Sequence, residues 1–159
     1  MSEKTARPQG CTNFKLRQLL RHVSRLYDAE LAAVGLKGTQ YSMLSHIVTL
    51  GPIQPGELAR RMGMDASTLT RNLRLLVDQG WAVQGPGQDA RSRLIEITPA
   101  GRALHATARR HWKKAQLAMN EAFGVERVMA LHALIDHGLD VLADGEDAAP
   151  DHARARASA

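Results

Sequence analysis

The stretch PGELARRMGMDASTLTRNLRLLVDQG, residues 55–80, holds the signals for two short helices with a tight turn between them. Pro55 suits the first turn of a helix, where its missing N–H is not needed. Gly63 ends that helix, and Asp65 is a natural N-cap for the next one, which ends at Gly80. Apolar residues at helical spacing give each helix one core-facing side: Leu58, Ala59 and Met62, then Leu69, Leu73, Leu76 and Val77. The stretch therefore predicts a helix-turn-helix motif.

A short β-hairpin is predicted directly after this motif. Trp81 and Val83 alternate with other residues, the polar stretch GPGQDARS follows at residues 85–92, and Ile95 and Ile97 alternate again. Alternation with period two on both sides of a polar turn is typical of two paired strands with a long tip. A helix-turn-helix followed by a hairpin is the order of elements in a winged helix-turn-helix lobe.

Longer amphipathic helices are predicted on both sides of this lobe. Apolar residues recur at steps of three and four over residues 12–34, and a short helix with Thr39 as its N-cap ends at Gly51. After Thr98, an N-cap followed by a first-turn proline, one long helix extends to Gly124 and another follows it. The predicted fold class is therefore mainly α with a small β wing.

These elements divide the chain into regions. Residues 12–38 and 99–143 are predicted to form a helical dimerisation region, residues 39–98 the winged helix-turn-helix lobe, and residues 144–159 a disordered tail without apolar periodicity. The apolar faces of the long helices exceed what a small winged lobe covers, and a two-fold dimer buries the same patch on both subunits. We therefore expect a homodimer.

Composition excludes several classes of protein. The chain has 159 residues, 44% of them hydrophobic, without an apolar signal-peptide stretch at its start or an apolar run near the roughly 20 residues that span a bilayer. We expect a cytoplasmic protein. A single cysteine, Cys11, provides neither an internal disulfide nor a multi-cysteine zinc site, and the sequence has no HExxH, GxSxG, phosphate-loop or dinucleotide motif. We expect neither enzymatic activity nor a cofactor or bound metal.

Positive charge is concentrated in the first two thirds of the chain. Residues 1–110 hold 16 Lys and Arg against 8 Asp and Glu, whereas residues 111–159 hold 5 against 8. This distribution favours a polyanionic partner for the winged lobe.

The second helix of the motif carries a polar face opposite its leucines. Ser67, Arg71 and Arg74 lie at positions i, i+4 and i+7, with Thr68 and Thr70 alongside. Hydroxyls and backbone N–H groups at a helix N-terminus can meet phosphates, while arginine reads guanine or holds phosphate. An ordinary amphipathic helix also presents a solvated polar face, so this helix alone leaves both interpretations open.

The tip of the predicted hairpin adds a second set of charges, namely Asp89, Arg91 and Arg93. A flexible cationic loop suits a minor groove or a flanking run of phosphates. Cations on both helix and wing favour double-stranded DNA as the partner. Two alternatives are a winged-helix module that binds protein and no longer reads DNA, and a protein that coats DNA without sequence preference.

Residues 55–104 resemble the core of the MarR family of bacterial transcriptional regulators. The similar motifs are the Ser-Thr-x-Thr-Arg helix, the Asp-x-Arg wing and the Thr-Pro-x-Gly-Arg start of the next helix, and the flanking long helices match from roughly residue 12 to residue 143. The resemblance implies a homodimer with interlocked terminal helices that binds a pseudo-palindromic operator, as a repressor, and releases it on binding a small molecule or on oxidation. It also implies that Arg91 enters the minor groove and that Asp89 orients the wing or the recognition helix through an ion pair.

One candidate for the effector site lies on the helix that follows Thr39. Relatives in the family bind aromatic acids or their thioesters between the dimer helices and the DNA-binding lobe. A polar stripe places Ser45 and His46 where they could hold such a carboxylate, together with Arg17 from the first helix. A stripe that only faces solvent is the alternative.

Cys11 is a second candidate for the signal. It lies just before the first long helix, near the reactive cysteine of the peroxide-sensing branch of the family. That branch's cysteine aligns nearer Asn13, however, and its partner tyrosine is replaced by Gly38. Oxidation sensing through Cys11 therefore stands beside the alternative of an incidental cysteine.

Overall fold

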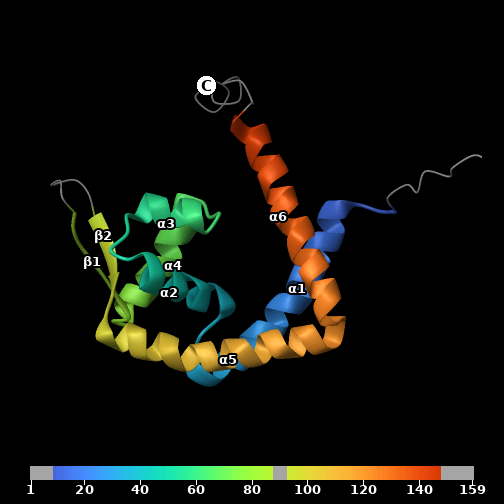
Figure 1. Cartoon of the computed structure of the whole chain (residues 1–159). Coiled ribbons are helices and arrows are strands. Elements are labelled where there is room, and N and C mark those ends of the chain that lie inside the picture. The colour runs from blue at the N-terminus through green and yellow to red at the C-terminus, as the bar shows by residue number, and fades with distance from the viewer. Residues whose placement is uncertain (1–8, 88–92, 148–159) are drawn as a thin grey trace, which may run out of the picture. The chain divides into compact units, whose positions relative to one another are not determined.

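The elements of the chain follow the predicted order, from long helix through winged lobe to two further helices (Figure 1). The computed structural model describes residues 9–87 and 93–147. Its elements are α1 (Thr12–Leu31), the 3-10 turn η1 (Ala32–Val34), α2 (Gly38–Leu50), α3 (Pro55–Arg61), α4 (Ala66–Asp78), β1 (Ala82–Pro86), β2 (Arg93–Ile97), α5 (Pro99–Phe123) and α6 (Val125–Asp147). The predicted fold class, mainly α with a small β wing, is confirmed.

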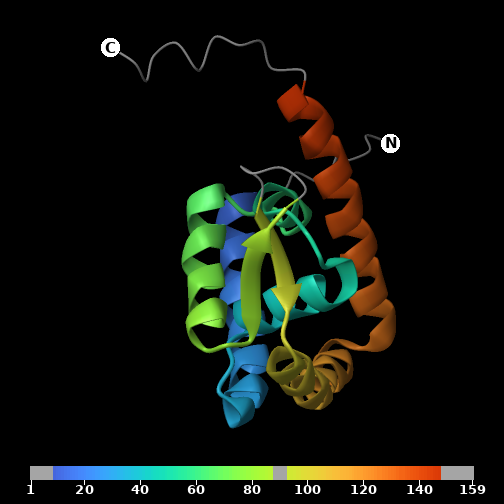
Figure 2. The ribbon, with the colours of Figure 1, turned by 90° about the vertical axis from the view of Figure 1, so that its left-hand side faces the viewer.

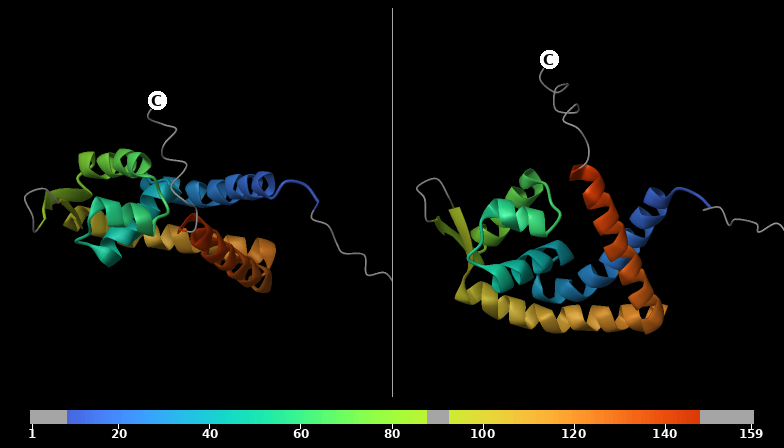
Figure 3. Two further views of the ribbon diagram at one scale, coloured as in Figure 1. Left: turned by 90° about the horizontal axis from the view of Figure 1, so that it is seen from above. Right: turned by 45° about the horizontal axis from the view of Figure 1, so that its top comes forward.

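The chain forms two compact units, residues 1–117 and residues 118–159. The first unit contains the elements from α1 to β2 and most of α5. Within it, α2 lies between the α3–α4 pair and α5 (Figures 1 and 3). The second unit consists of the end of α5, Gly124 with a positive φ of 83°, and α6.

Local signals explain the helix-turn-helix of α3 and α4. Pro55 occupies the first turn of α3, and Glu57 accepts hydrogen bonds from Arg60 and then Arg61, which lower its pKa to about 2. Gly63 takes a positive φ of 59° in the turn. Asp65 then caps α4, because its carboxylate accepts the Thr68 N–H at 2.7 Å.

The wing is an antiparallel pair, β1 and β2, in which β1 lies beside α4 (Figure 2) and β2 contacts α2 and α3. The strand begins one residue later than the alternation of Trp81 and Val83 suggested. Ala82 is the buried residue, whereas Val83 is 48% exposed. The reason is register: Ala82 pairs with Ile97, on the same face as the buried Ile95.

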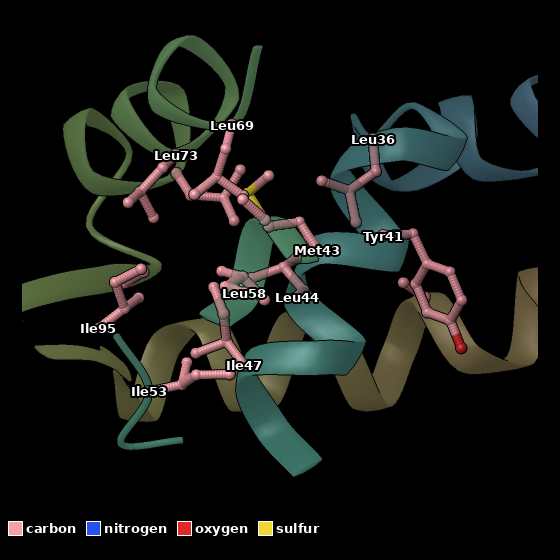
Figure 4. Close-up of a cluster of buried hydrophobic side chains, with 14 of the residues drawn as sticks. Leu36, Tyr41, Met43, Leu44, Ile47, Ile53, Leu58, Leu69, Leu73 and Ile95 are labelled. Atoms are coloured by element: carbon pink, nitrogen blue, oxygen red, sulfur yellow. The ribbon is translucent and has the colours of Figure 1, made fainter. Parts of the chain in front are cut away.

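Ile53 ties this wing to the rest of the lobe. Ile53 and Ile95 exchange backbone hydrogen bonds of 3.1 and 2.8 Å, so the segment between α2 and α3 is bridged to β2. The core beneath is formed by apolar side chains that converge from α2, α3, α4 and β2 (Figure 4), among them Met43, Leu44, Ile47, Leu58, Leu69, Leu73 and Ile95. This packing fixes which face of α4 is turned to solvent.

The start of α5 is joined to the end of α4. The predicted cap Thr98 accepts the Gly101 N–H at 3.0 Å and donates its hydroxyl to the carbonyl of Gly80 at 2.7 Å. Gly101 is buried directly against the backbone of Trp81, where a β-carbon would overlap the carbonyl oxygen. The predicted N-cap and first-turn proline are thus confirmed.

Two boundaries differ from the sequence prediction. Thr39 is not the N-cap of α2, which begins at Gly38. The first N–H groups there are satisfied by other side chains: Lys37 N–H donates to Gln40 Oε1 at 2.8 Å, and Gly38 N–H donates to Asp28 Oδ1 at 2.6 Å. The tail was predicted to start at residue 144, but α6 continues to Asp147, and residues 148–159 lie outside the described residues.

Candidate nucleic-acid interface

The predicted recognition face lies on the solvent side of α4. Leu69, Leu73 and Leu76 are buried on one side of the helix. The five predicted contact residues lie on the remaining surface and are exposed, apart from the half-buried Thr68: Ser67, Thr68, Thr70, Arg71 and Arg74. The spacing of apolar residues in the sequence therefore predicts correctly which side of α4 is buried and which side is exposed.

Asp65 organises the hydroxyl groups at the start of this face. Its carboxylate accepts the Ser67 hydroxyl at 2.6 Å and both the N–H and the hydroxyl of Thr68 at 2.7 Å. These hydrogen bonds, that of Ser67 first, hold the pKa of Asp65 well below its usual range. The Thr70 hydroxyl donates to the carbonyl of Ala66 at 2.7 Å. Because all three hydroxyl protons are used within the protein, these side chains face an incoming ligand as acceptors.

The donors of the face are its two arginines. Arg74 Nε lies 3.7 Å from Asp78 Oδ2, with side-chain exposures of 82% and 61%. An ion pair this exposed is weak and can yield to a phosphate at small cost. Arg71 is exposed and forms no ion pair within residues 9–87 and 93–147. Both guanidinium groups are therefore available to an anionic partner.

The wing contributes one described cation. Arg93 is the first residue of β2, pairs with Pro86 and is exposed. Asp89 and Arg91, which were predicted for the tip, lie outside the described residues.

The three residues predicted to hold an effector are not brought together. Ser45 and His46 line a hollow of about 420 Å³ with Thr49, Leu50 and Arg61, but Arg17 does not line it. Arg17 is exposed on α1. Arg61 could not be singled out from the sequence, because nothing local distinguishes it from Arg60 on the charged face of α3. His46 Nδ1 lies 2.8 Å from the Ser42 carbonyl oxygen. Since that oxygen only accepts, Nδ1 carries a hydrogen and Nε2 stays available.

A second cavity, of about 430 Å³, was not predicted at all. It lies among α1, α2 and α5 within the first compact unit, and its walls include Tyr27, Asp28, Leu31, Tyr41, Ser42 and Trp112. The rings of Tyr41 and Trp112 are stacked with centroids 6.1 Å apart. Only 4% of the residues in this chain are aromatic, so the aromatic residues themselves were the signal in the sequence that could have indicated this cavity.

His105 closes one edge of this aromatic group. Its ring stacks on Tyr41 at 5.4 Å, and its Nε2 lies 3.0 Å from the Ser45 hydroxyl oxygen. Burial, followed by the charges of Arg109 and Arg102, lowers the pKa of His105. The imidazole is therefore neutral in the folded protein at neutral pH.

Three further features concern the single cysteine, metal binding and the membrane. Cys11 is exposed at the N-cap position of α1. Within the described residues, no three His, Cys, Asp or Glu side chains are grouped so that they could hold a metal ion. None of the described helices combines the length and the apolar character needed to cross a membrane.

The architecture defines the class of protein: a winged helix-turn-helix protein with an exposed basic helix. A model of the MarR family matches residues 34–92. The multiple antibiotic resistance protein MarR of Salmonella typhimurium is 35% identical over 81 residues, 50% of this chain and 56% of that protein. The uncharacterized HTH-type transcriptional regulator YwoH of Bacillus subtilis is 29% identical over 84 residues, 53% of this chain and 61% of that protein. The matched stretch thus spans little more than half of these curated relatives.

Similarity to solved structures extends over more of the chain. The M. tuberculosis transcriptional regulator MosR, crystallised with DNA, is 31% identical with a TM-score of 0.69, over 82% of this chain and 98% of that one. A mutant of E. coli MarR crystallised with operator DNA shares the fold, with a TM-score of 0.75 at 23% identity over 80% of this chain and 92% of that one. The chain belongs to the MarR family of winged helix-turn-helix transcriptional regulators, which are not enzymes.

Proposed function

We propose that this protein binds DNA sequence-specifically as a homodimer on a pseudo-palindromic operator and acts as a repressor in the cytoplasm. The observation that carries the proposal is the solvent face of α4. There Arg71 and Arg74 are exposed and can contact an anionic partner, and Asp65 holds the hydroxyl groups of Ser67 and Thr68 in place. Arg93 extends the positive charge onto the wing. The DNA complex of MosR, at 31% identity, supports the same assignment.

Exposed apolar side chains support the homodimer. On α6, the side chains of Met129, Leu134, Leu139 and Leu142 are 63–71% exposed, and that of Ile135 is 42% exposed. At the start of α1, Phe14, Leu16 and Leu20 are 53–63% exposed. A second copy of the chain would remove both surfaces from water. We therefore retain residues 12–38 and 99–143 as the dimerisation region and residues 39–98 as the DNA-binding lobe, which would place two α4 helices about 34–36 Å apart.

Replacing Arg71 tests the DNA-binding proposal. Because a bidentate arginine discriminates bases strongly, Arg71→Ala is expected to weaken operator binding by about 10- to 100-fold. The measurement is fluorescence anisotropy with labelled DNA from upstream of the protein's own gene, with random competitor and across a salt series. Arg110→Ala, an exposed arginine on α5, is the matched control and should bind like the parent.

The parent protein's behaviour in the same assay separates the alternatives. Binding that survives random competitor at physiological salt supports a specific regulator. Binding that competitor abolishes supports a coating protein. Absence of binding even at low salt supports a protein-interaction module. An Arg71→Ala variant that binds the operator as tightly as the parent would show that α4 is not the recognition helix.

We further propose that a small molecule releases the protein from DNA. The aromatic carboxylate expected from the sequence fits the hollow lined by Ser45, His46 and Arg61, because the guanidinium of Arg61 lies there as a cationic donor. Arg61 Nε is held by Glu57 Oε1 at 2.8 Å, which leaves its terminal nitrogens to bind an anion. His46 Nδ1 donates to the Ser42 carbonyl, so Nε2 donates to a carboxylate when the ring carries both hydrogens.

Replacing His46 tests this assignment. His46→Ala is expected to lower the affinity for an aromatic acid such as benzoate about tenfold, since the hydrogen bond that the doubly protonated ring donates to the carboxylate is lost. Arg17→Ala is the control, because Arg17 does not line the hollow. Affinities are measured by calorimetry without DNA. Equal affinity of the His46→Ala variant and the parent would remove this hollow from consideration as the carboxylate site.

A further inference from the structure

We propose that the solvent side of α5 is a second DNA-binding surface, which holds a further DNA duplex while α4 holds the operator. Every exposed residue from Arg102 to Lys114 is either basic or alanine. The basic ones, which we call the α5 basic face, are Arg102, Arg109, Arg110, Lys113 and Lys114. The inference goes beyond the proposed function, and only its bridging of two duplexes rests on operator binding by α4.

The charge of the α5 basic face is not neutralised by neighbouring acids. Helix α5 contains no Asp or Glu before Glu121, and none of the five cations forms an ion pair with an acid in the part of the chain that the structure describes. Helix geometry places Arg102, Arg109 and Lys113 within about 40° of one another around the axis. Their field reaches His105, whose pKa is lowered by burial and then by the charges of Arg109 and Arg102. The face therefore concentrates positive charge on one side of one helix.

The α5 basic face is turned away from the recognition helix. The opposite side of α5 packs into the core, where Ala108 is fully buried and Leu104 and Trp112 lie against it. Helix α2 lies between α5 and the α3–α4 pair (Figures 1 and 3). DNA on α4 therefore leaves the α5 basic face uncovered, and single changes there such as Arg110→Ala do not alter operator affinity.

The proposed dimer also leaves the α5 basic face free. The exposed apolar side chains that a second copy would cover lie at the start of α1 and on α6. From Arg102 to Lys114, by contrast, no exposed residue is apolar apart from alanine. Burying unpaired cations in an interface costs several kcal/mol for each ion. The dimer contact therefore forms elsewhere.

The dimensions and chemistry of the α5 basic face fit duplex DNA. Its twelve helical steps extend over about 18 Å, a length in which duplex DNA presents about ten phosphate charges. Three of its five cations are arginines, whose guanidinium groups hold phosphate in a bidentate manner. Without exposed side chains larger than alanine, the face lacks the apolar groups with which an interfacial helix enters a membrane. A flexible acidic polypeptide would lose conformational entropy on binding, which the stiff duplex does not.

Direct titration tests the second surface independently of the first. The probe is a short fluorescent duplex of random sequence, and the starting protein is Arg71→Ala/Arg74→Ala, in which the α4 cations are absent. It should still bind the probe at low salt. Adding Arg102→Gln, Arg109→Gln and Lys113→Gln should weaken binding at least about tenfold and lower the slope of log affinity against log salt by about 3, because three phosphate contacts are lost. Equal affinities and slopes for the two proteins would overturn the proposal.

Two controls separate a local surface from net charge. Arg25→Gln, Lys37→Gln and Arg127→Gln together remove the same charge from three exposed and scattered positions, and in the same background should change affinity by less than about threefold. Arg102→Lys with Arg109→Lys keeps the charge of the face and should bind close to the starting protein. An equal loss in the scattered variant would show that net charge alone is responsible and would overturn the assignment to α5. All three α5 side chains are exposed, so melting followed by circular dichroism should match the parent.

A capture experiment then tests whether both surfaces act together. DNA from upstream of the protein's own gene is immobilised, loaded with the parent protein and exposed to the fluorescent duplex. The protein with only the three α5 replacements should be retained like the parent and should capture at least about tenfold less duplex, since each lost phosphate contact lowers the affinity. Retention of the parent without capture would overturn this inference. Failure of the parent to be retained would contradict the proposed function instead, and the titration would still decide for or against the α5 basic face.

Other polyanions are compared in the same capture format. Phosphatidylglycerol vesicles and polyglutamate replace the fluorescent duplex as the second ligand. We expect both to be captured less than the duplex. Stronger capture of either one, lost when the three α5 cations are replaced, would assign the face to a membrane or to an acidic protein and would overturn the assignment to DNA.

Discussion

Gly101→Ala is expected to destabilise the winged lobe severely. A β-carbon at this position would overlap the carbonyl oxygen of Trp81 and would lie 2.8 Å from Ile97 Cδ1. The Trp81 carbonyl is a backbone group and accepts the Thr98 N–H at 3.1 Å, so it cannot move away without breaking this hydrogen bond. The strand and the start of α5 would therefore have to separate. Overpacking of this kind costs about 3 kcal/mol or more, which corresponds to a decrease in Tm on the order of 10 °C for a chain of this size.

The control for Gly101→Ala is Gly56→Ala in α3. No atom lies within contact distance of a β-carbon at Gly56, and an alanine within a helix is favoured over glycine. Circular dichroism melting should therefore show a Tm equal to or above that of the parent for Gly56→Ala and a large decrease for Gly101→Ala. If Gly101→Ala melts with the parent, α5 does not begin against Trp81 as described.

Leu139→Asp is expected to convert the protein from a dimer to a monomer. Leu139 is 63% exposed in the single chain and continues the apolar stripe of α6 that includes Val128, Ile135 and Leu142. In a two-fold dimer the substitution places two carboxylates in the interface, and burying each without a partner costs several kcal/mol. The dimer dissociation constant should rise at least about 100-fold. Sedimentation velocity over a concentration series measures it directly.

The control for Leu139→Asp is Ala133→Asp on the same helix. Ala133 is exposed on the side of α6 that carries Asp136 and Asp140, so its substitution should leave the dimer intact. Operator affinity should fall together with dimerisation in Leu139→Asp, because a monomer meets only one half-site. A Leu139→Asp protein that remains dimeric would show that the two copies meet through a different surface.

The helix-turn-helix followed from the sequence because its signals are local. Pro55, Gly63 and Asp65 act within a turn or two of their own position, and the structure confirms all three roles. The exposed face of α4 was predictable for a related reason: a helix repeats every 3.6 residues, so the burial of Leu69 and Leu73 determines where Arg71 points. The contacts that Ser67 and its neighbours make with DNA stay a prediction.

The residues that line the two hollows could be predicted less completely, because a pocket joins residues that are distant in the chain. The polar stripe of α2 placed Ser45 and His46 on one surface, but the cation beside them is Arg61 of α3 and not Arg17 of α1. Sequence spacing carries no information about which helix lies across a hollow. The cavity of Asp28 and Trp112 was missed for the same reason, since its walls come from three helices.

The amino-acid sequence alone was enough to define the helices, their order, the winged lobe and the side of α4 that meets solvent, because periodicity and capping act over a few residues. Tertiary structure decided the features that depend on partners far along the chain. Pairing of Ala82 with Ile97 sets the register that buries Ala82 in place of Val83. The Asp28 carboxylate accepts the N–H of Gly38 at the start of α2, ten residues further along the chain, and the same carboxylate lines the aromatic cavity. Such contacts are selected by packing of the whole lobe, so no short segment encodes them.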